Sequence, residues 1–380
     1  MNTPASNIEK APSEEQWLAL AEKLGKQFAE RADDYDRDRA FVQQNYDDLR
    51  DYGFFSAAIP EVMGGGDLSH QALCDVIRIL GRHCGSTGLA FAMHSHPVAL
   101  NVFKYLRGDE KAKATLGKIA GNNLIIAGTG ANDWLNSNGT ASKVDSGYRV
   151  NAHKHFVSGG PGAQILVTSV AYNGENGKEV LHFSIPFNSE GISIQDNWNT
   201  TGMRGTGSHD VILENVFIPD TAIVARRPAG VWHPLWDTIL PIAMPVIVSC
   251  YVGIAEAAVE FAIRASSGKA HLALQIGEMK NELVTAQLAL NDTQRICDNY
   301  RFTPGINNTD AILARKTIAT RAAQSAVEIA ANTIGGAAFF QGHPVERMLR
   351  DIRAMHFHPL PENRQQILSG RIALKLDPLE

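Results

Sequence analysis

The sequence predicts an α+β protein in which a central β domain separates two helical parts. Apolar residues recur at helical spacing before about residue 122 and again after about residue 229. Between these parts, short β-branched runs alternate with Gly, Asn and Asp, which is typical of strands joined by turns. With 380 residues, of which 44% are apolar, the chain can bury a large core and form two or three subdomains. The expected divisions are 1–122, 123–228 and 229–380.

Helix signals are clear in the first part. Ser13 and Gln16 form a capping-box pattern, and apolar residues then follow at one-face spacing, which predicts a first helix. Apolar spacing also predicts helices over 36–52, 71–82 and 86–106, the last with a kink at Pro97.

Strands are predicted in the middle of the chain, and helices return after Pro228. Pro359 and Pro361 lack backbone donors, so the helix that starts at Pro344 should stop there, expose His356 or His358, and give way to a new helix from Glu362. The expected strands are 124–127, 148–150, 155–158, 164–171, 180–185 and 211–218, and the expected long helices are 237–266, 270–300 and 309–333.

Composition excludes several functional classes. A formal net charge of -5, with no face-wide excess of Lys and Arg, argues against nucleic-acid binding. The four cysteines are scattered and have no metal-ligand spacing, so no metal site is predicted and a reducing cytoplasm is the expected location. The first twelve residues lack the pattern of a secretion signal. The apolar stretch 239–254 contains two prolines and is too short for a membrane span.

Four motifs occur along the chain in a recognisable order. The loop after residue 52 contains Pro-Glu-x-x-Gly-Gly, residues 203–208 contain Arg-x-Thr-x-Ser, Gly335-Gly336 ends a helical run, and Arg350-Asp351 lies on a basic helix. Together they resemble the acyl-CoA dehydrogenase superfamily, over essentially the whole chain. The resemblance implies an N-terminal helical domain, a central β-barrel-like domain, a C-terminal four-helix bundle and a homotetramer.

The segment Asn151–Gly160 resembles the part of that family that lies against a flavin ring. An isoalloxazine needs an apolar face to stack on and a hydroxyl near N5, and Phe156 and Ser158 match these needs. The resemblance assigns further cofactor contacts to the turn at Ala127 and Thr129, which lacks the usual Glu. It assigns the cofactor phosphate to Asn332, Gly335, Gly336 and Arg347.

The type of flavin stays open between FMN, FAD and a diffusible reduced flavin. The family usually has an Arg-x-x-Phe-Gly segment that reaches the dinucleotide of a neighbouring subunit. Residues 268–272 read GKAHL instead, so the guanidinium that would hold a pyrophosphate is absent.

The catalytic corner departs from the dehydrogenase pattern. A dehydrogenase needs a carboxylate to remove the proton alpha to a thioester. Alignment on Arg350-Asp351 places Pro359 at the usual position of that Glu, and the alternative position is Met244. Glu362 is the nearest substitute, and Asp237 is a weaker one.

His358-Pro359 at this corner resembles the flavin monooxygenase branch of the superfamily, of the dibenzothiophene monooxygenase type. Phe156 and Ser158 match that branch as well, and His94 matches a His at the end of the fourth helix. A group that titrates near neutrality would manage the proton of the activated oxygen, whereas a structural His would bond to backbone. Substrate contacts are assigned to Arg204, Ser208, Trp232 and Trp236, although the two tryptophans also fit a core aromatic pair.

The sequence therefore predicts a two-component monooxygenase that takes reduced flavin from a separate reductase and uses O2 on a small apolar or aromatic substrate. No nucleic-acid or membrane partner is expected. One alternative is an acyl-CoA dehydrogenase that uses Glu362, and another is a catalytically silent assembly subunit.

Overall fold

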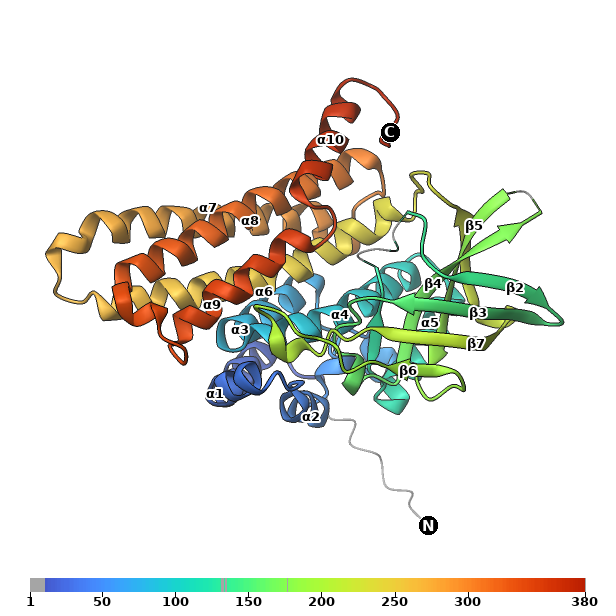
Figure 1. Ribbon diagram of the computed structural model, residues 1–380, viewed down its shortest axis with the longest axis horizontal. Helices are drawn as coiled ribbons and strands as arrows, with labels where there is room; N and C mark the ends of the chain where they lie inside the picture. The colour runs from blue at the N-terminus through green and yellow to red at the C-terminus, as the bar shows by residue number, and fades with distance from the viewer. Residues whose placement is uncertain (1–10, 131–132, 134, 176, 380) are drawn as a thin grey trace, which may run out of the picture.

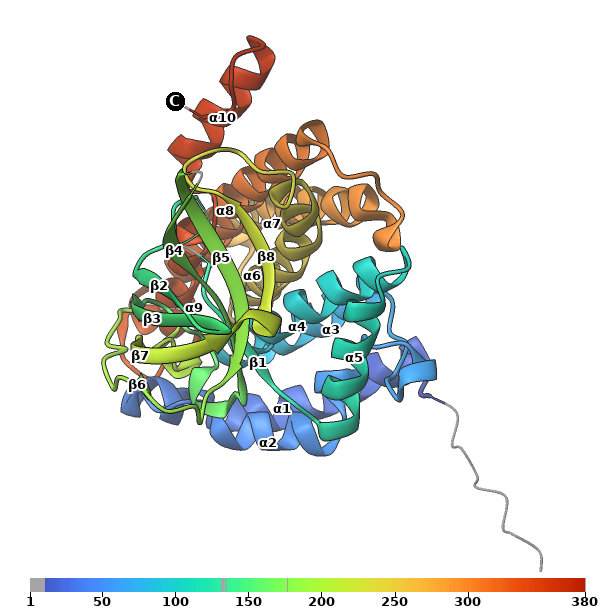
Figure 2. The same ribbon diagram turned by 90° about the vertical axis from the view of Figure 1, so that its right-hand side faces the viewer.

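The computed structural model describes residues 11–130, 133, 135–175 and 177–379 (Figures 1 and 2). Helices come first, a sheet follows, and helices complete the chain, so the predicted α+β order is confirmed. Residues 1–10, for which the sequence predicts no secretion signal, lie outside the described part of the chain.

The first helix begins at the predicted capping box. The Ser13 N–H donates to Gln16 Oε1 at 2.7 Å, and the Gln16 N–H donates to Ser13 Oγ at 3.3 Å. The helix continues to Asp38, so the prediction that a new helix starts at residue 36 is wrong. Arg39 ends it in the left-handed conformation (φ 54°), and a short break precedes the next helix. The helices are α1 Glu14–Asp38, α2 Gln43–Asp51, α3 His70–His83, α4 Gly85–Tyr105, which contains Pro97, and α5 Glu110–Asn122.

In the part of the chain that the structure describes, the central domain is an eight-stranded sheet of order β6-β7-β3-β2-β4-β5-β8, with β1 beside β4. Among the described residues no pairing joins β6 to β8, so the barrel-like sheet is open along that line. The prediction of a strand over 155–158 is wrong, because the chain turns at Phe156 (φ 61°). The strands are β1 Ile126–Gly128, β2 Thr140–Val144, β3 Gly147–Lys154, β4 Ile165–Gly174, β5 Gly177–Pro186, β6 Ile192–Ile194, β7 Val211–Pro219 and β8 Ile223–Pro228.

The C-terminal part is a bundle of long helices with two short ones on its side (Figure 1). Its last α-helix before the prolines ends at Asp351, and a 3-10 segment, Ile352–Phe357, carries the chain to the corner. The helix therefore stops earlier than Pro359 requires. The helices are α6 Trp236–Ala265, α7 Ala273–Cys297, α8 Ile306–Ile334, α9 Pro344–Asp351 and α10 Glu362–Ala373.

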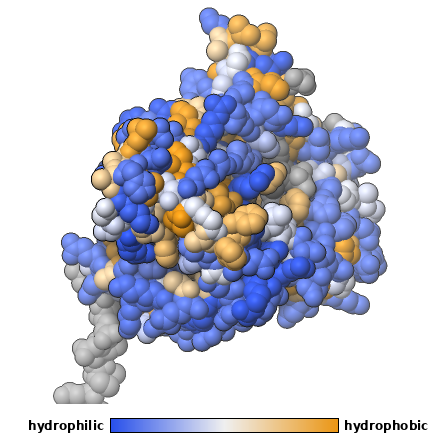
Figure 3. All heavy atoms as spheres, turned by 60° about the vertical axis from the view of Figure 1, so that its left-hand side comes forward, coloured by the Kyte–Doolittle hydropathy of each residue, from blue (hydrophilic) through white to orange (hydrophobic). Residues whose placement is uncertain are grey.

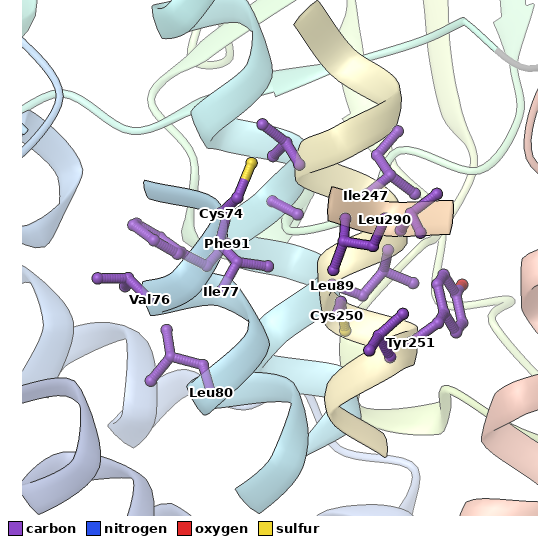
Figure 4. Packing of buried hydrophobic residues seen from close by; sticks show 14 of the residues in the cluster. Cys74, Val76, Ile77, Leu80, Leu89, Phe91, Ile247, Cys250, Tyr251 and Leu290 are labelled. Atoms are coloured by element: carbon purple, nitrogen blue, oxygen red, sulfur yellow. The ribbon is translucent and has the colours of Figure 1, made fainter. Parts of the chain in front are cut away.

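Helix α6 is the centre of the helical core. It is long and apolar enough to span a membrane, but 89% of its most apolar 18-residue window is buried inside the protein. Helix α3 crosses it closely, because a Cβ on Gly81 would lie 2.3 Å from the Cys250 carbonyl oxygen. Figure 4 shows Ile77 of α3 and Ile247 of α6 in this packing.

The helices before and after the sheet share one hydrophobic core, whereas the sheet has a core of its own. The first and last thirds of the chain thus pack as one unit against the β domain. The division at residues 122 and 228 stays a prediction.

Candidate active site

A row of hydroxyl groups lies where two loops of the β domain meet. Beyond β3 the chain turns, and the backbone of Val157 and Gly159 bonds to His209 and Thr206 of the loop that precedes β7. This pairing brings Ser158 Oγ within 2.7 Å of Ser208 Oγ. Thr206 Oγ1 lies 2.6 Å from the same Ser208 oxygen. The loops therefore present adjoining donors and acceptors beside the turn.

The Phe156 ring lies next to this row and is open to solvent. The residue is 49% exposed, and its ring meets that of Trp198 edge to face at 6.1 Å between centroids. An exposed aromatic face beside a partly buried hydroxyl suits a flat heterocycle with polar edges. Phe156, Ser158 and Ser208 thus lie together at this turn.

The Arg-Asp pair of α9 fixes the second loop. The Met203 N–H donates to Asp351 Oδ1, and Arg350 Nη1 donates to the Thr201 carbonyl at 2.8 Å. A Cβ on Gly202 would lie 2.3 Å from the Arg350 carbonyl, so only glycine fits there. Burial raises the pKa of Asp351 to about 6, and the neighbouring Arg347 opposes this shift. The motif therefore joins the C-terminal helices to the loop that carries Ser208.

At the corner, His358 bonds to Tyr251 of α6. The Tyr251 hydroxyl and His358 Nε2 are 2.7 Å apart, and the two rings meet at 5.4 Å between centroids. Burial lowers the pKa of His358 to about 3, and the charges of Lys316 and His96 contribute. Burial also raises the pKa of Tyr251 well above its usual range. The pair is therefore neutral at physiological pH, and it can pass or hold a proton without carrying a net charge.

Lys316 of α8 contacts the backbone of this corner. Its side chain is buried, and Nζ donates to the Leu360 carbonyl at 3.1 Å. Burial lowers the pKa of Lys316 to about 8. The other corner histidine, His356, bonds instead to Gln324. Of the two, only His358 bonds to Tyr251 of α6.

His94 has a structural environment, which corrects its assignment as a catalytic residue. Its Nε2 bonds to the Phe55 carbonyl at 2.8 Å, and its Nδ1 accepts from the Ile126 N–H at 3.0 Å. With both nitrogens bonded to backbone, the ring has no site left for proton exchange. The charge that His96, two residues further along α4, would carry when protonated contributes to the lowered pKa of His358, as that of His94 contributes to the lowered pKa of His96. Sequence reasoning missed both His96 and Tyr251.

The carboxylates considered as dehydrogenase bases are already engaged. Glu362 forms a two-pronged ion pair with Arg321, which lowers its pKa. Asp237 Oδ1 accepts from Thr309 Oγ1 at 2.8 Å and from Trp232 Nε1 at 3.2 Å. A base that is stabilised in its charged form is a weaker proton acceptor.

The residues assigned to the substrate, apart from Ser208, make packing contacts. Trp236 is buried, with the Arg227 guanidinium 5.0 Å from its ring centroid. Trp232 bonds to Asp237, as noted above. Arg204 Nε donates to the Thr200 carbonyl at 2.9 Å. The contacts of the two tryptophans agree with the alternative that they pack in the core. None of the contacts given for Trp232, Trp236 and Arg204 is with Ser208.

The residues assigned to the cofactor phosphate lie at the end of the bundle remote from the sheet, where α8 ends and α9 begins (Figure 1). Gly335 (φ 81°) and Gly336 are exposed, and a Cβ on either would meet nothing within 4 Å. Asn332 is exposed, but Arg347 is buried and forms an ion pair with Asp33 at 2.8 Å. Of the other assigned contacts, Ala127 is buried in β1, and Thr129 Oγ1 is bonded to Asp133 and Thr168.

Five histidines whose pKa values are lowered by burial predict that acid reduces the stability of the fold. Burial lowers the pKa of His70, His94, His96 and His182 to about 4 each, and that of His358 to about 3. The unfolded chain therefore binds more protons below pH ~6.5, so this stability is present above pH ~6.5 and is lost as the pH falls. Burial raises the pKa of Asp351 and of Asp75, and these two carboxyls act in the opposite sense, but the five histidines outnumber them. We expect a lower urea midpoint at pH 5 than at pH 7, and an equal or higher midpoint at pH 5 would contradict this.

Comparisons with known proteins bear on this fold and site. Models of the acyl-CoA dehydrogenase N-terminal, middle and C-terminal domains match residues 12–122, 127–216 and 246–361. The pigment production hydroxylase of Rhodococcus sp. (strain ATCC 21145) is 26% identical, over 93% of this chain and 95% of its own. The mitochondrial isovaleryl-CoA dehydrogenase of Oryza sativa subsp. japonica is 24% identical, over 86% of this chain and 82% of its own.

A solved structure of similar fold is that of FMN-bound TdsC, a dibenzothiophene monooxygenase from Paenibacillus sp. A11-2. Its TM-score is 0.83 at 20% identity, with 94% of this chain and 97% of that chain covered. At this identity the likeness shows the fold alone. The three domain models match in their family order and cover most of the sequence. The predicted resemblance is therefore confirmed, and the chain belongs to the acyl-CoA dehydrogenase superfamily.

Proposed function

We propose that the chain is a two-component flavin-dependent monooxygenase. It takes reduced flavin from a separate reductase and inserts one oxygen atom of O2 into a small apolar or aromatic substrate. The observation that carries this proposal is the neutral Tyr251–His358 pair at the corner where a dehydrogenase would hold a carboxylate. A neutral pair can hold or move a proton at an oxygen atom, but it is a poor base for a carbon acid.

The described side chains fit a flavin. The exposed Phe156 ring offers a face for stacking, and Ser158 offers a hydroxyl at the ring edge. A bound reduced flavin would supply the electrons that activate dioxygen. Ser158 would bond to the N5 edge, Ser208 would hold the Ser158 hydroxyl in place, and His358 would manage the proton at the oxygen, with Tyr251 orienting its ring.

The glycine turn at Gly335 lies at the end of the bundle remote from the sheet, whereas the Phe156 loop directly follows strand β3 of the sheet (Figure 1). If that turn holds the cofactor phosphate, it does so for the flavin of another copy, which agrees with the expected homotetramer. Apolar patches on the surface of the bundle also suit assembly (Figure 3). Exposed apolar residues of the bundle include Leu274, Leu288, Phe339 and Phe340.

The acyl-CoA dehydrogenase alternative is favoured by the relatives, several of which are mitochondrial isovaleryl-CoA dehydrogenases. It requires Glu362 to leave Arg321 before it can act as a base. The ion pair makes this the weaker proposal.

The test begins with binding. The protein is titrated with FMN and FAD, each oxidised and reduced, and the change in fluorescence shows which flavin binds. Phe156→Ala should weaken the binding of that flavin. The protein loaded anaerobically with reduced flavin is then mixed with oxygenated buffer. We expect a long-lived absorbance transient, distinct from both reduced and oxidised flavin, that Ser158→Ala shortens.

The other outcomes point elsewhere. Immediate return of oxidised flavin, together with bleaching of bound FAD by an acyl-CoA, would support the dehydrogenase. Failure to bind any flavin would support a catalytically silent assembly subunit.

A further inference from the structure

Two histidines and one aspartate converge on the outer face of the sheet, beside the Phe156 turn. His153 Nε2 lies 2.7 Å from Asp210 Oδ2, and His155 Nδ1 lies 3.0 Å from the same oxygen. The two imidazole rings are 4.2 Å apart between centroids. The possible ligand atoms all lie within 4.8 Å of one another. Three groups that commonly bind metals thus meet at one point.

Sheet geometry explains why they meet. His153 and His155 are two residues apart, so both point to the outer face, whereas the intervening Lys154 is buried on the opposite face. There Lys154 pairs with Asp133, so its charge is directed away from the histidines. Asp210 directly precedes β7, which is antiparallel to β3 with Lys154 opposite Val211. The aspartate is therefore held level with the two rings.

Asp210 is held in place by a second layer of contacts. Asn197 Nδ2 donates to Asp210 Oδ2 at 2.9 Å, and the Asp210 N–H donates to Asn197 Oδ1 at 3.0 Å. His153, His155 and Asn197 all bond to the same carboxylate oxygen, Oδ2. The carboxylate is therefore held in one orientation, as metal ligands supported by neighbouring groups usually are.

The cluster is also accessible. The side chains of His153 and His155 are 52% and 35% exposed, while that of Asp210 is 12% exposed. An ion can thus approach from solvent and meet a carboxylate at the base of the site. Because the exposed rings can rotate, small movements would open the nitrogen-to-oxygen distances to those of a coordinated ion, in which zinc–ligand bonds are about 2.0–2.2 Å.

We propose that His153, His155 and Asp210 form a binding site for a divalent transition-metal ion, with Zn²⁺ as the expected occupant. Two imidazole nitrogens and one carboxylate oxygen are ligands that suit zinc, and water would complete the coordination. The ion would join the end of β3 to the loop that precedes β7, next to Phe156. The proposal does not depend on the reaction that the chain catalyses.

The experiment titrates Zn²⁺ into the full chain, free of any purification tag, by calorimetry, and uses the visible absorption of Co²⁺ as a probe of coordination. We expect one ion per chain and a Co²⁺ spectrum that shows imidazole ligation. Asp210→Asn and His153→Ala should weaken Zn²⁺ binding at least as much as the about 10–100-fold typical of losing a second-layer contact. Asn197→Ala removes such a second-layer contact, so it should weaken Zn²⁺ binding by about 10–100-fold.

His271→Ala provides the matched control, because it removes an exposed histidine outside the cluster. It should bind Zn²⁺ as the unaltered chain does. Circular dichroism of each variant separates loss of a ligand from loss of the fold. Equal Zn²⁺ binding by Asp210→Asn, His153→Ala and the unaltered chain would overturn the proposal, as would the absence of a one-to-one complex. Either result would mean that the three side chains form hydrogen bonds with one another and bind no metal ion.

Discussion

Replacing His358 by alanine should shorten the oxygen-dependent absorbance transient of the flavin-loaded protein by about 100-fold, the lower end of what a positioned acid–base group contributes. The reason is that burial lowers the pKa of His358 and keeps it neutral, while the bond to Tyr251 fixes its ring, so that it can hold a proton at a fixed atom. Tyr251→Phe keeps the ring and removes only the hydroxyl, so it should give a smaller reduction. Both are measured by stopped-flow absorbance, which needs no knowledge of the substrate.

His356→Ala is the matched control for this prediction. It removes the histidine two residues earlier, within the 3-10 segment that ends at Phe357, and that histidine bonds to Gln324 rather than to Tyr251. We expect its transient to last about as long as that of the unaltered protein. If His356→Ala and His358→Ala shorten the transient equally, the corner acts through its shape rather than through the proton of His358.

Replacing Lys154 by methionine should reduce the free energy of unfolding by about 3–5 kcal/mol, because it leaves a buried carboxylate without its partner. Lys154 is fully buried, and its Nζ donates to Asp133 Oδ2 at 2.9 Å and to Ser137 Oγ at 3.1 Å. Burial lowers the pKa of Lys154, whereas the charge of Asp133 raises it. Urea unfolding followed by fluorescence and by circular dichroism measures the loss.

A surface pair on the same sheet is the control. Lys143 and Asp220 are 2.7 Å apart, but their side chains are 46% and 50% exposed. Lys143→Met should therefore cost at most about 1 kcal/mol. The double variant Lys154→Met/Asp133→Leu should lose less free energy of unfolding than the sum of the losses in Lys154→Met and Asp133→Leu. A Lys154→Met loss as small as that of Lys143→Met would show that the buried pair contributes little.

Local signals predicted the helices well and the turn at Phe156 poorly. The Ser13 capping box and the apolar face that follows act within a few residues, so they can be read directly from the sequence. His155–Ser158 has the composition of a strand, but backbone bonds from Val157 and Gly159 to a loop about 50 residues away shape it into a turn. Such bonds leave no mark on local composition.

The site was predictable only in so far as it matched a family pattern. Phe156, Ser158 and His358 could be assigned in this way, but the Tyr251–His358 bond joins residues 107 positions apart. His94 was assigned through the family pattern as well, but both of its ring nitrogens bond to backbone. His96 is two residues further along the same helix and therefore points in a nearly opposite direction. His153 and Asp210 are also far apart in the sequence, and it is the pairing of β3 with β7 that brings them together.

The core shared by the helices on either side of the sheet has a consequence for synthesis of the protein. Helices α1 to α5 leave the ribosome long before α6, whose residues fill the core between them. Until then the faces of α3 and α4 that pack on α6 have no partner, whereas the β domain has a core of its own and can close first. The nascent N-terminal third is therefore the part that depends most on chaperones, and its folding waits for the C-terminal helices to emerge.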